Sequence, residues 1–390
     1  MSVTAAKGFK AGGVCCGIKA EGIADLSLVA TVDHQPVAAA AVFTTNLAAA
    51  APVQVSRAHL AATGGRAAAV ILNSGNANAA TGADGRATSQ GACDLVAEEL
   101  GCDASEVLVC STGLIGIPLR LDPFTAGVPT LVSILEATTE GGEVAADAIM
   151  TTDTVRKESV AIASGVTVGG MAKGAAMLAP NMATMLAVLT TDAKVEPDVL
   201  QRLLAQAMDH SFHRISVDGC TSTNDTVIIL ASGKSDTDVD AALLGDLITR
   251  VCADLAEQMV RDAEGATKLV RVTVVGAADD ADAAKAARRV AEAVLTKCSW
   301  YGEDPYWGRI VSEAASAGAA FDVDKVSVAY GGVVVASGGV AVDHDHEAVA
   351  AHMQEDRIDV TVDLGLGSGT CWMLTNDLTH AYIDENMGTS

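Results

Sequence analysis

Short runs of apolar and β-branched residues, bounded by glycine or polar residues, recur along the chain. Runs of roughly four to eight such residues between turn signals are typical of strands, and those that are apolar throughout are typical of buried strands. The pattern predicts strands at residues 25–32, 37–43, 52–56, 67–72, 106–110, 185–191, 226–231, 267–275, 325–330, 332–337 and 357–364.

Longer segments with apolar residues every three or four positions predict helices between these strands. They cover residues 88–100, 130–149, 196–210, 238–261 and 280–297. In the first helix Thr88 is the predicted N-cap and Gly101 the stop, and Gly141-Gly142 is expected to interrupt the second. Because strands and helices are mixed throughout and glycine pairs favour hairpins, the sequence predicts a layered α/β fold, with mixed or antiparallel sheets sandwiched with helices.

Composition narrows the class of protein. Half of the 390 residues are hydrophobic but only 3% are aromatic, so the core must be built from small and aliphatic side chains. The 49 acidic residues outnumber the 25 basic ones, and no segment of the chain has lysine and arginine residues clustered together. A nucleic-acid-binding protein is therefore excluded, and we interpret the acidity as an aid to solubility. No apolar run is long enough for a membrane span or a signal peptide, which predicts a cytoplasmic protein.

Metal and nucleotide chemistry find no support in the motifs. The nine cysteines are scattered without a CxxC pair, so we expect reduced, mostly buried thiols and neither disulfides nor a zinc site. His344 and His346 are expected in a solvated loop or helix start. No glycine-rich phosphate loop of either common type occurs.

The central stretch KGAAMLAPNMATMLAVLTTD, residues 173–192, allows two interpretations. In one, residues 185–191 form an ordinary buried strand. In the other, the Ala183-Thr184 bond is cut and Thr184 becomes a new N-terminus. A threonine hydroxyl is a weak nucleophile until a base lies beside it, and a free α-amine on the same residue can be that base.

Three polar loops follow predicted elements: NSGNANA at 73–79, STGLIG at 111–116 and TTDT at 151–154. Loops at strand ends are where functional sites tend to be built. Seven motifs resemble, in order and over nearly the whole chain, the ornithine acetyltransferase family: the first two of these loops together with KGAAMLAPNMATML, VDGCTSTND at 217–225, EGATKL at 264–269, EDPYWGRI at 303–310 and NDLTHAYIDEN at 376–386. This family comprises the glutamate N-acetyltransferases of arginine biosynthesis.

The resemblance implies a self-processing enzyme with an N-terminal-nucleophile architecture. Cleavage between Ala183 and Thr184 would give an α chain of residues 1–183 and a β chain of residues 184–390. The Thr184 hydroxyl would then take the acetyl group from N-acetylornithine, release ornithine and pass the acetyl group to glutamate, which is a ping-pong mechanism.

Site residues follow from the same resemblance. The Thr112 hydroxyl and the Gly113 backbone N–H are implied as the donors that stabilise the oxyanion, and a residue without Cβ suits that close approach. Lys173 and Glu264 are implied as charged substrate contacts. The remaining implied contacts are Thr152, Asn386 and Ser390, together with Thr184.

This chain departs from the family pattern at three places. His213 and Cys220 stand where asparagine and aspartate are expected, and Tyr306 stands where asparagine is usual. The tail ENMGTS is one residue shorter than the form that we would align with it. The shorter tail makes Thr389 the alternative to Ser390 as the C-terminal substrate contact.

The implied reaction needs no metal and no bound cofactor. Its small-molecule partners would be N-acetylornithine and glutamate, and the fragments would assemble as a heterotetramer or larger. One alternative is a bifunctional enzyme that also acetylates glutamate from acetyl-CoA. A second is a self-processing aminopeptidase or amidase of related architecture, and a third is an unprocessed binding or assembly protein.

Overall fold

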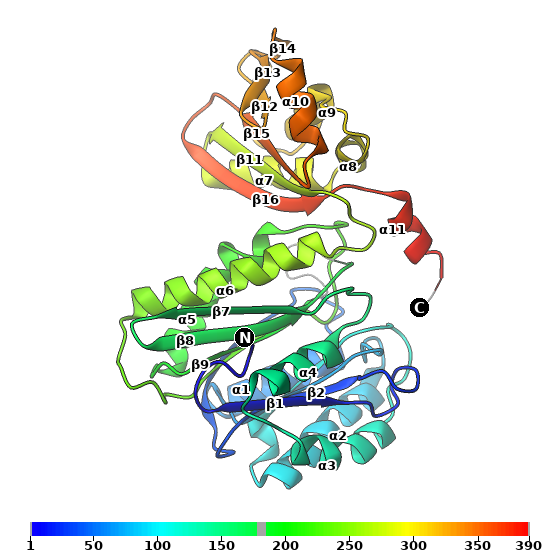
Figure 1. Cartoon of the computed structure of the whole chain (residues 1–390), viewed down its shortest axis with the longest axis vertical. Coiled ribbons are helices and arrows are strands. Elements are labelled where there is room, and N and C mark those ends of the chain that lie inside the picture. The colour runs from blue at the N-terminus through cyan, green and yellow to red at the C-terminus, as the bar shows by residue number, and fades with distance from the viewer. Residues whose placement is uncertain (1, 178–184, 389–390) are drawn as a thin grey trace. The chain divides into compact units, whose positions relative to one another are not determined.

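The computed structural model describes residues 2–177 and 185–388, which form two compact units (Figure 1). The first unit comprises the chain up to His213 together with Cys220–Met259. The second comprises Arg214–Gly219 and the chain from Val260 on. Among the described residues, no helix is both long and apolar enough to cross a membrane.

The first unit contains a four-stranded sheet in the order β1-β2-β5-β6. Its strands are β1 (Phe9–Val14), β2 (Leu26–Thr31), β5 (Ala69–Asn73) and β6 (Val107–Ser111). β1, β2 and β5 are antiparallel, and β5 and β6 run parallel. On one face Leu28 and Ile71 pack with residues of α2 (Gly82–Leu100) and α3 (Asp122–Ser133).

A six-stranded sheet in the order β4-β3-β10-β9-β8-β7 lies in the same unit. Its strands are β4 (Arg66–Ala67), β3 (Val37–Phe43), β10 (Thr226–Ala231), β9 (Leu186–Thr191), β8 (Val166–Lys173) and β7 (Lys157–Ala163). β9 and β10 are buried along their whole length and pair in parallel, Leu186 opposite Thr226.

The two sheets of this unit face each other. Val70 and Leu108 of one sheet share a hydrophobic cluster with Val188 and Ile228 of the other, and α4 (Thr139–Ile149) joins it. The helices α5 (Pro197–Asp209) and α6 (Ala241–Arg261) pack on the outer face of the six-stranded sheet (Figure 1). The first unit is therefore a sandwich of two sheets covered by helices on both sides, which confirms the predicted layered α/β fold.

The second unit is built on a sheet in the order β14-β13-β12-β15-β11-β16. Its strands are β11 (Leu269–Ala277), β12 (Ser327–Tyr330), β13 (Val333–Ser337), β14 (Val340–Ala341), β15 (Arg357–Asp363) and β16 (Gly369–Asn376). Its helices are α7 (Asp280–Glu292), α8 (Val294–Tyr301), α9 (Trp307–Ala315), α10 (His346–Gln354) and α11 (His380–Glu385). In the core of this unit, valines of β11 and β15 pack with the buried alanines of α7.

Most predicted elements are present, but the strand predicted at 52–56 is wrong. These residues belong to α1 (Ala51–Ala62). Pro52 lies in its first turn, where a missing N–H costs nothing and the fixed φ favours helix entry. The side chains of Ser56 and His59 bond the Val109 and Val107 carbonyls of β6, so tertiary contacts outweigh the strand propensity of the two valines.

Several helix boundaries also differ from the prediction. α2 begins at Gly82 rather than after Thr88. As predicted, it ends before Gly101, and this glycine adopts the left-handed conformation. The helical segment at 130–149 breaks between α3 and α4, and Gly141-Gly142 lies in the first turn of α4. A Cβ on Gly141 would lie 2.7 Å from the Ala11 carbonyl, so the glycine permits close packing against β1. The helix at 280–297 is two helices, separated by the extended Ala293.

Candidate active site

The predicted oxyanion loop after β6 lies against the loop at 73–79. Thr112 N donates to the Asn73 carbonyl at 3.0 Å, and Ala77 N donates to the Leu114 carbonyl at 2.9 Å. Gly113 has a φ of +128°, and a Cβ there would lie 2.3 Å from the carbonyl carbon of Gly75. Only glycine can occupy this position without displacing the neighbouring backbone.

The Thr112 hydroxyl is buried and has no hydrogen-bond partner within residues 2–177 and 185–388. An unpaired buried hydroxyl costs about 1–3 kcal/mol, so native structures keep few of them. Thr112 lines a small cavity of about 20 Å³. The other lining residues are Ala77, Gly113, Ile115, Met177, Ser222, Thr223 and Asn224. A hydroxyl without a partner at a cavity wall is a hydrogen-bond donor available to a bound molecule.

Asn224, which the sequence analysis did not single out, fixes both loops of this cavity. Its Nδ2 donates to the Ala77 carbonyl at 2.6 Å and to the Ser111 carbonyl at 2.8 Å. Ser111 directly precedes Thr112, and Asn224 is buried. Because both amide hydrogens are used, the side chain holds the two loops at a set separation. The motif VDGCTSTND contained this residue, but the spacing alone could not reveal which loops it joins.

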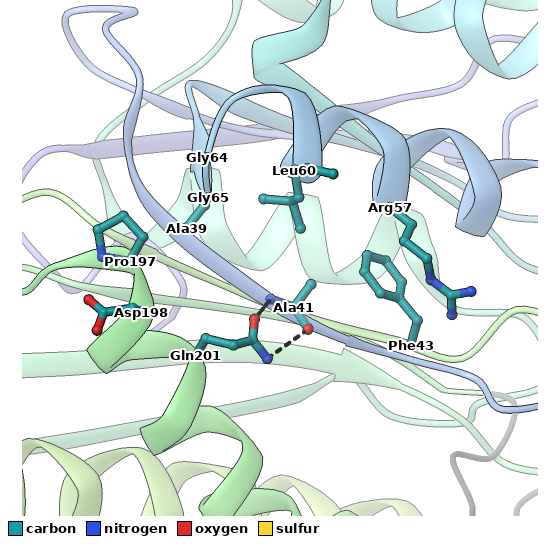
Figure 2. Close-up of a pocket in the computed structure, with 11 residues that line it drawn as sticks. Ala39, Ala41, Phe43, Arg57, Leu60, Gly64, Gly65, Pro197, Asp198 and Gln201 are labelled. Atoms are coloured by element: carbon teal, nitrogen blue, oxygen red, sulfur yellow. Dashed lines mark hydrogen bonds between the residues drawn. The ribbon is translucent and has the colours of Figure 1, made fainter.

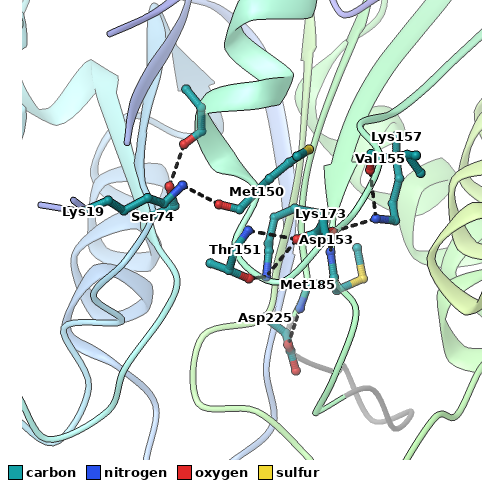
Figure 3. A network of polar contacts seen from close by, with 12 residues as sticks. Lys19, Ser74, Met150, Thr151, Asp153, Val155, Lys157, Lys173, Met185 and Asp225 are labelled. Atoms are coloured by element: carbon teal, nitrogen blue, oxygen red, sulfur yellow. Dashed lines mark hydrogen bonds and ion pairs between the residues drawn. The ribbon is translucent and has the colours of Figure 1, made fainter. Parts of the chain in front are cut away.

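Lys173 belongs to a buried cluster of charges at the end of β8 (Figure 3). Asp153 Oδ1 accepts from Lys157 Nζ at 2.7 Å and from Gly174 N at 2.7 Å. Its Oδ2 accepts from Thr151 N at 3.0 Å and lies 3.7 Å from Lys173 Nζ. Burial raises the pKa of Asp153, but the ammonium groups of Lys173 and Lys157 outweigh it and hold the pKa well below its usual range.

The turn at 151–154 contributes to this cluster through a different threonine from the predicted one. Lys173 Nζ donates to Thr151 Oγ1 at 2.7 Å, whereas Thr152 is exposed. The buried face of the turn therefore positions the lysine, and Thr152 faces solvent beside it. Sequence alone could not distinguish the two hydroxyls, because an irregular turn has no side-chain periodicity.

Asp225 is fully buried immediately before β10. Its Oδ1 accepts from Met185 N at 3.0 Å (Figure 3). Burial raises the pKa of Asp225 well above its usual range, although Met185 N–H, the Ser222 hydroxyl and the charge of Lys173 each act in the opposite direction. Burial therefore favours the protonated form of this carboxyl group, and its neighbour Met185 directly follows the predicted nucleophile.

In the second unit, Glu264 and Asn386 are brought together. Asn386 Nδ2 donates to Glu264 Oε2 at 2.7 Å and to the Tyr382 carbonyl at 2.8 Å. Desolvation, followed by the carboxylates of Glu264 and Asp262, raises the pKa of Glu385. This end of the unit is therefore electronegative, which suits a cationic group.

Lys297 anchors the segment that leads into α11. Its Nζ is buried and donates to Thr375 Oγ1 at 2.6 Å, to the Asn376 carbonyl at 2.8 Å and to Asn376 Oδ1 at 2.9 Å. We expect Lys297→Met to lower the free energy of unfolding by about 3 kcal/mol or more, because buried acceptors lose their donor. Urea denaturation measures this, with the exposed Lys285→Met as a control that leaves the midpoint unchanged. Equal midpoints for the two variants would contradict the prediction.

Four predicted residues lie outside the described residues: Ala183, Thr184, Thr389 and Ser390. Of the residues that depart from the family pattern, His213 pairs with Asp209, Cys220 is exposed, and Tyr306 precedes α9. All nine cysteines are free as predicted, but only four are buried, so the prediction of mostly buried thiols is wrong. Among the described residues no group of side chains could hold a metal ion, and His346 begins α10 as expected.

A larger hollow of about 440 Å³ lies between α1 and α5, along the edge of β3 (Figure 2). None of the predicted site residues lines it. The Gln201 side chain bonds both the N–H and the carbonyl of Ala41 there, in the manner of a neighbouring strand. The amide thus covers part of a sheet edge, which is a protective arrangement.

Comparison with known proteins agrees with the motifs. Residues 10–388 match the model of the ArgJ family. The arginine biosynthesis bifunctional protein ArgJ of Thermobifida fusca is 47% identical over the full length of both chains, and that of Streptomyces avermitilis is 48% identical, also over the full length of both.

Two solved structures are also similar in sequence. One, of an ArgJ protein from Bacillus halodurans, is 35% identical, with a TM-score of 0.49 over 50% of this chain and 96% of that one. The other, an ornithine acetyltransferase of Mycobacterium tuberculosis in complex with ornithine, is 45% identical, with a TM-score of 0.42 over 46% of this chain and 94% of that one. The family match and the full-length relatives confirm the resemblance drawn from the motifs. The chain belongs to the ArgJ family.

Proposed function

We propose that this protein is a glutamate N-acetyltransferase that transfers acetyl from N-acetylornithine to glutamate through an acetyl ester on Thr184. Membership of the family supports the reaction class. The observation that carries the site is the buried Thr112 hydroxyl without a partner among the described residues, next to Gly113, whose φ of +128° and close approach to the Gly75 backbone only glycine allows.

In the first half-reaction the Thr184 hydroxyl attacks the acetyl carbonyl, and its proton passes to the Thr184 α-amine. The negative charge that develops on the carbonyl oxygen is stabilised by the Thr112 hydroxyl and the Gly113 N–H. The C–N bond breaks, the protonated amine returns its proton to the leaving nitrogen, and ornithine departs. In the second half-reaction the glutamate amine attacks the ester by the same route in reverse.

The charged residues suit an amino-acid substrate. Lys173, held by Asp153 and Thr151, would pair with the substrate carboxylate, and Glu264, held by Asn386, would pair with an amine. Thr152 and Asn386 would add neutral hydrogen bonds, with Ser390 or Thr389 contributing from the tail. These roles require neither a metal nor a bound cofactor, and we place the enzyme in the cytoplasm.

The predicted fragments would remain one folded body after cleavage. In the chain, residue 184 comes between β8 and β9, which are both strands of the first compact unit. β9 and β10 would belong to the β chain, yet they pair with β8 on one side and β3 on the other, both from the α chain. Because one sheet alternates between the fragments, separating them would require unfolding it. We propose that such αβ units assemble further, as a heterotetramer or larger.

The test combines a denaturing gel with an assay of acceptor dependence. Purified wild-type protein should show two fragments of nearly equal size, and Thr184→Ala should remain intact. N-acetylornithine should be consumed only when glutamate is present, apart from one equivalent that acylates the enzyme. Consumption at the same rate without glutamate would instead establish an amidase, and an intact wild-type band would contradict the self-processing nucleophile.

The names of the relatives favour a second activity, because they describe bifunctional proteins. We propose that acetyl-CoA can also load the same threonine, so that glutamate is acetylated without N-acetylornithine. Incubation with acetyl-CoA and glutamate alone should then give N-acetylglutamate, and Thr184→Ala should give none. Absence of product with the wild-type enzyme would restrict it to the recycling reaction.

A further inference from the structure

Lys19 lies in the loop between β1 and β2, and a buried carboxylate fixes the backbone of this loop. The Asp25 side chain accepts from four backbone N–H groups at 2.6–3.1 Å, those of Cys16, Gly17, Ile18 and Lys19. Hydrogen bonds to a charged acceptor are stronger than neutral ones, and Asp25 is fully buried. The Lys19 side chain therefore extends from a fixed point of the first unit.

The ammonium group of Lys19 reaches the turn that follows α4 (Figure 3). Its Nζ donates to the Met150 carbonyl at 2.5 Å and to the Ala24 carbonyl at 3.1 Å. The peptide unit that joins Met150 to Thr151 is planar, and its N–H donates to Asp153 Oδ2 at 3.0 Å. Lys19 and Asp153 thus hold opposite sides of one peptide unit, which fixes its orientation.

This peptide unit also determines where Lys173 is held. Lys173 Nζ donates to Thr151 Oγ1 at 2.7 Å, and the Thr151 side chain follows the orientation of its own backbone. Burial lowers the pKa of Lys19, the charge of Asp25 opposes this, and the charge of Lys173 adds to it. The two ammonium groups are therefore within electrostatic reach of each other, on a side of the site that suits a carboxylate.

The stem of Lys19 packs on the loop that lies against the oxyanion loop. Gly75 has a φ of +98°, and a Cβ there would lie 2.8 Å from Lys19 Cγ. Only a residue without a side chain leaves room for this contact. Gly75 in turn packs against Gly113. Lys19 thus lies between the support of the oxyanion donors and the Met150 carbonyl.

The proposed substrate requires a set separation between these two parts of the site. In an N-acetylated α-amino acid, one nitrogen and one Cα lie between the acetyl carbonyl and the carboxylate. Thr112 and Gly113 are proposed to act on the carbonyl, and Lys173 on the carboxylate. Their separation must match this short span, because a misplacement of about 1 Å can lower a rate about 100-fold.

We propose that Lys19 is a positioning residue of acetyl transfer, which places Lys173 relative to the oxyanion donors by holding the Met150 carbonyl. It acts through Lys173 and not by contact with the substrate. Through this link it makes the enzyme select substrates that have a free α-carboxylate. This inference rests on the proposed function and deepens it, because it names what holds the two ends of the site in register.

Lys19→Met tests this role, because it keeps the stem on Gly75 and removes the donor to Met150. The test compares kcat/KM of the full protein for N-acetylornithine and for its α-carboxamide, which has no carboxylate for Lys173. Wild type should prefer the carboxylate at least about 30-fold, as loss of one partner of a charge pair predicts.

The Lys19→Met variant should lose most of this preference. We expect kcat/KM for N-acetylornithine to fall about tenfold or more, and kcat/KM for the carboxamide to stay within about threefold of wild type. A purely structural role would lower both values by the same factor. An equal loss with the two substrates would therefore overturn the proposal.

Lys10→Met is the matched control. Lys10 is also partly buried in the first unit, burial lowers its pKa too, and its Nζ lies 2.8 Å from His34 Nε2. This variant should keep the wild-type preference for the carboxylate. A loss of preference equal to that of Lys19→Met would overturn the assignment.

A second variant decides if Lys19→Met does not fold. Lys19→Gln keeps a polar head for solvent, but its side chain is one atom shorter and extends from a backbone that Asp25 fixes. The Met150 carbonyl should therefore lose its donor, and the preference for the carboxylate should fall at least about threefold. Retention of the full wild-type preference by Lys19→Gln would overturn the proposal.

Failure of the proposed function would look different. Wild-type protein that transfers no acetyl group from N-acetylornithine to glutamate would refute the proposed function itself. Wild-type protein that transfers acetyl but does not prefer the carboxylate would refute the role of Lys173, and the inference on Lys19 with it. Normal transfer and preference in wild type, with both unchanged in Lys19→Met, would overturn this inference alone.

Discussion

Replacing Thr112 with valine is expected to lower kcat for acetyl transfer by about 100- to 1,000-fold, as loss of one oxyanion donor does in other acyl-transfer enzymes. Valine matches threonine in shape, so the small cavity is kept and the hydroxyl alone is removed. KM for N-acetylornithine should change little, because the donor acts on charge that develops only in the transition state. Steady-state kinetics with N-acetylornithine and glutamate measure both constants.

The same substitution should not destabilise the fold. Because the Thr112 hydroxyl has no partner among the described residues, its removal relieves a desolvation cost instead of breaking a bond. Thr112→Val should therefore unfold at or above the wild-type temperature while it loses activity, and Thr112→Ser, which keeps a hydroxyl, should retain much of the rate. If Thr112→Val were both fully active and more stable than wild type, Thr112 would not be an oxyanion donor.

Asp153→Asn is expected to lower the free energy of unfolding by about 3–5 kcal/mol. The substitution keeps the shape of the side chain but leaves the buried Lys157 and Lys173 without their shared anion. KM for N-acetylornithine should also rise about tenfold or more, which corresponds to about 1.4 kcal/mol of lost binding, because the carboxylate no longer positions Lys173. Chemical denaturation and steady-state kinetics at a temperature where the variant is folded measure the two effects.

Acid dependence gives a second test of this pair of lysines. Their charges hold the pKa of Asp153 low, so the stability that the carboxylate contributes is fully present above about pH 4 and is lost only as the pH falls through the lowered value. The measurement is the pH midpoint of acid unfolding. Asp198→Asn is the control, because Asp198 forms an exposed ion pair with Arg202 and the loss of this pair should barely change that midpoint. Similar acid-unfolding midpoints for Asp153→Asn and Asp198→Asn would contradict the role given to Asp153.

The local sequence pattern was sufficient to predict strands that are almost completely buried and helix ends that carry a clear stop residue. The apolar runs at β3 and β10 were predicted to the residue, and Gly101 was recognised as the end of α2. Pattern failed at α1, where buried polar side chains bond a neighbouring strand. It also failed at β1 and β8, whose glycines are uncommon in strands and are needed here for close packing.

The candidate site divides in the same way. Thr112, Gly113 and Lys173 were predicted because contiguous motifs carry them; the family match confirms the family, and the roles of these residues stay predictions. Asn224, Asp153 and Asp225 were missed as site residues, because their importance lies in contacts with segments up to 147 residues away along the chain.

The sequence by itself therefore determined the family, the layered α/β class and the residues implied for chemistry. Only the tertiary structure decided which polar groups support them: the Asn224 amide between two loops, the Asp153 carboxylate between two lysines, and the Asp225 acid beside Met185. The physical reason is that strand and helix propensities act over a few neighbouring residues. Hydrogen bonding and burial depend instead on which distant segments the sheets bring together, and no local pattern records that.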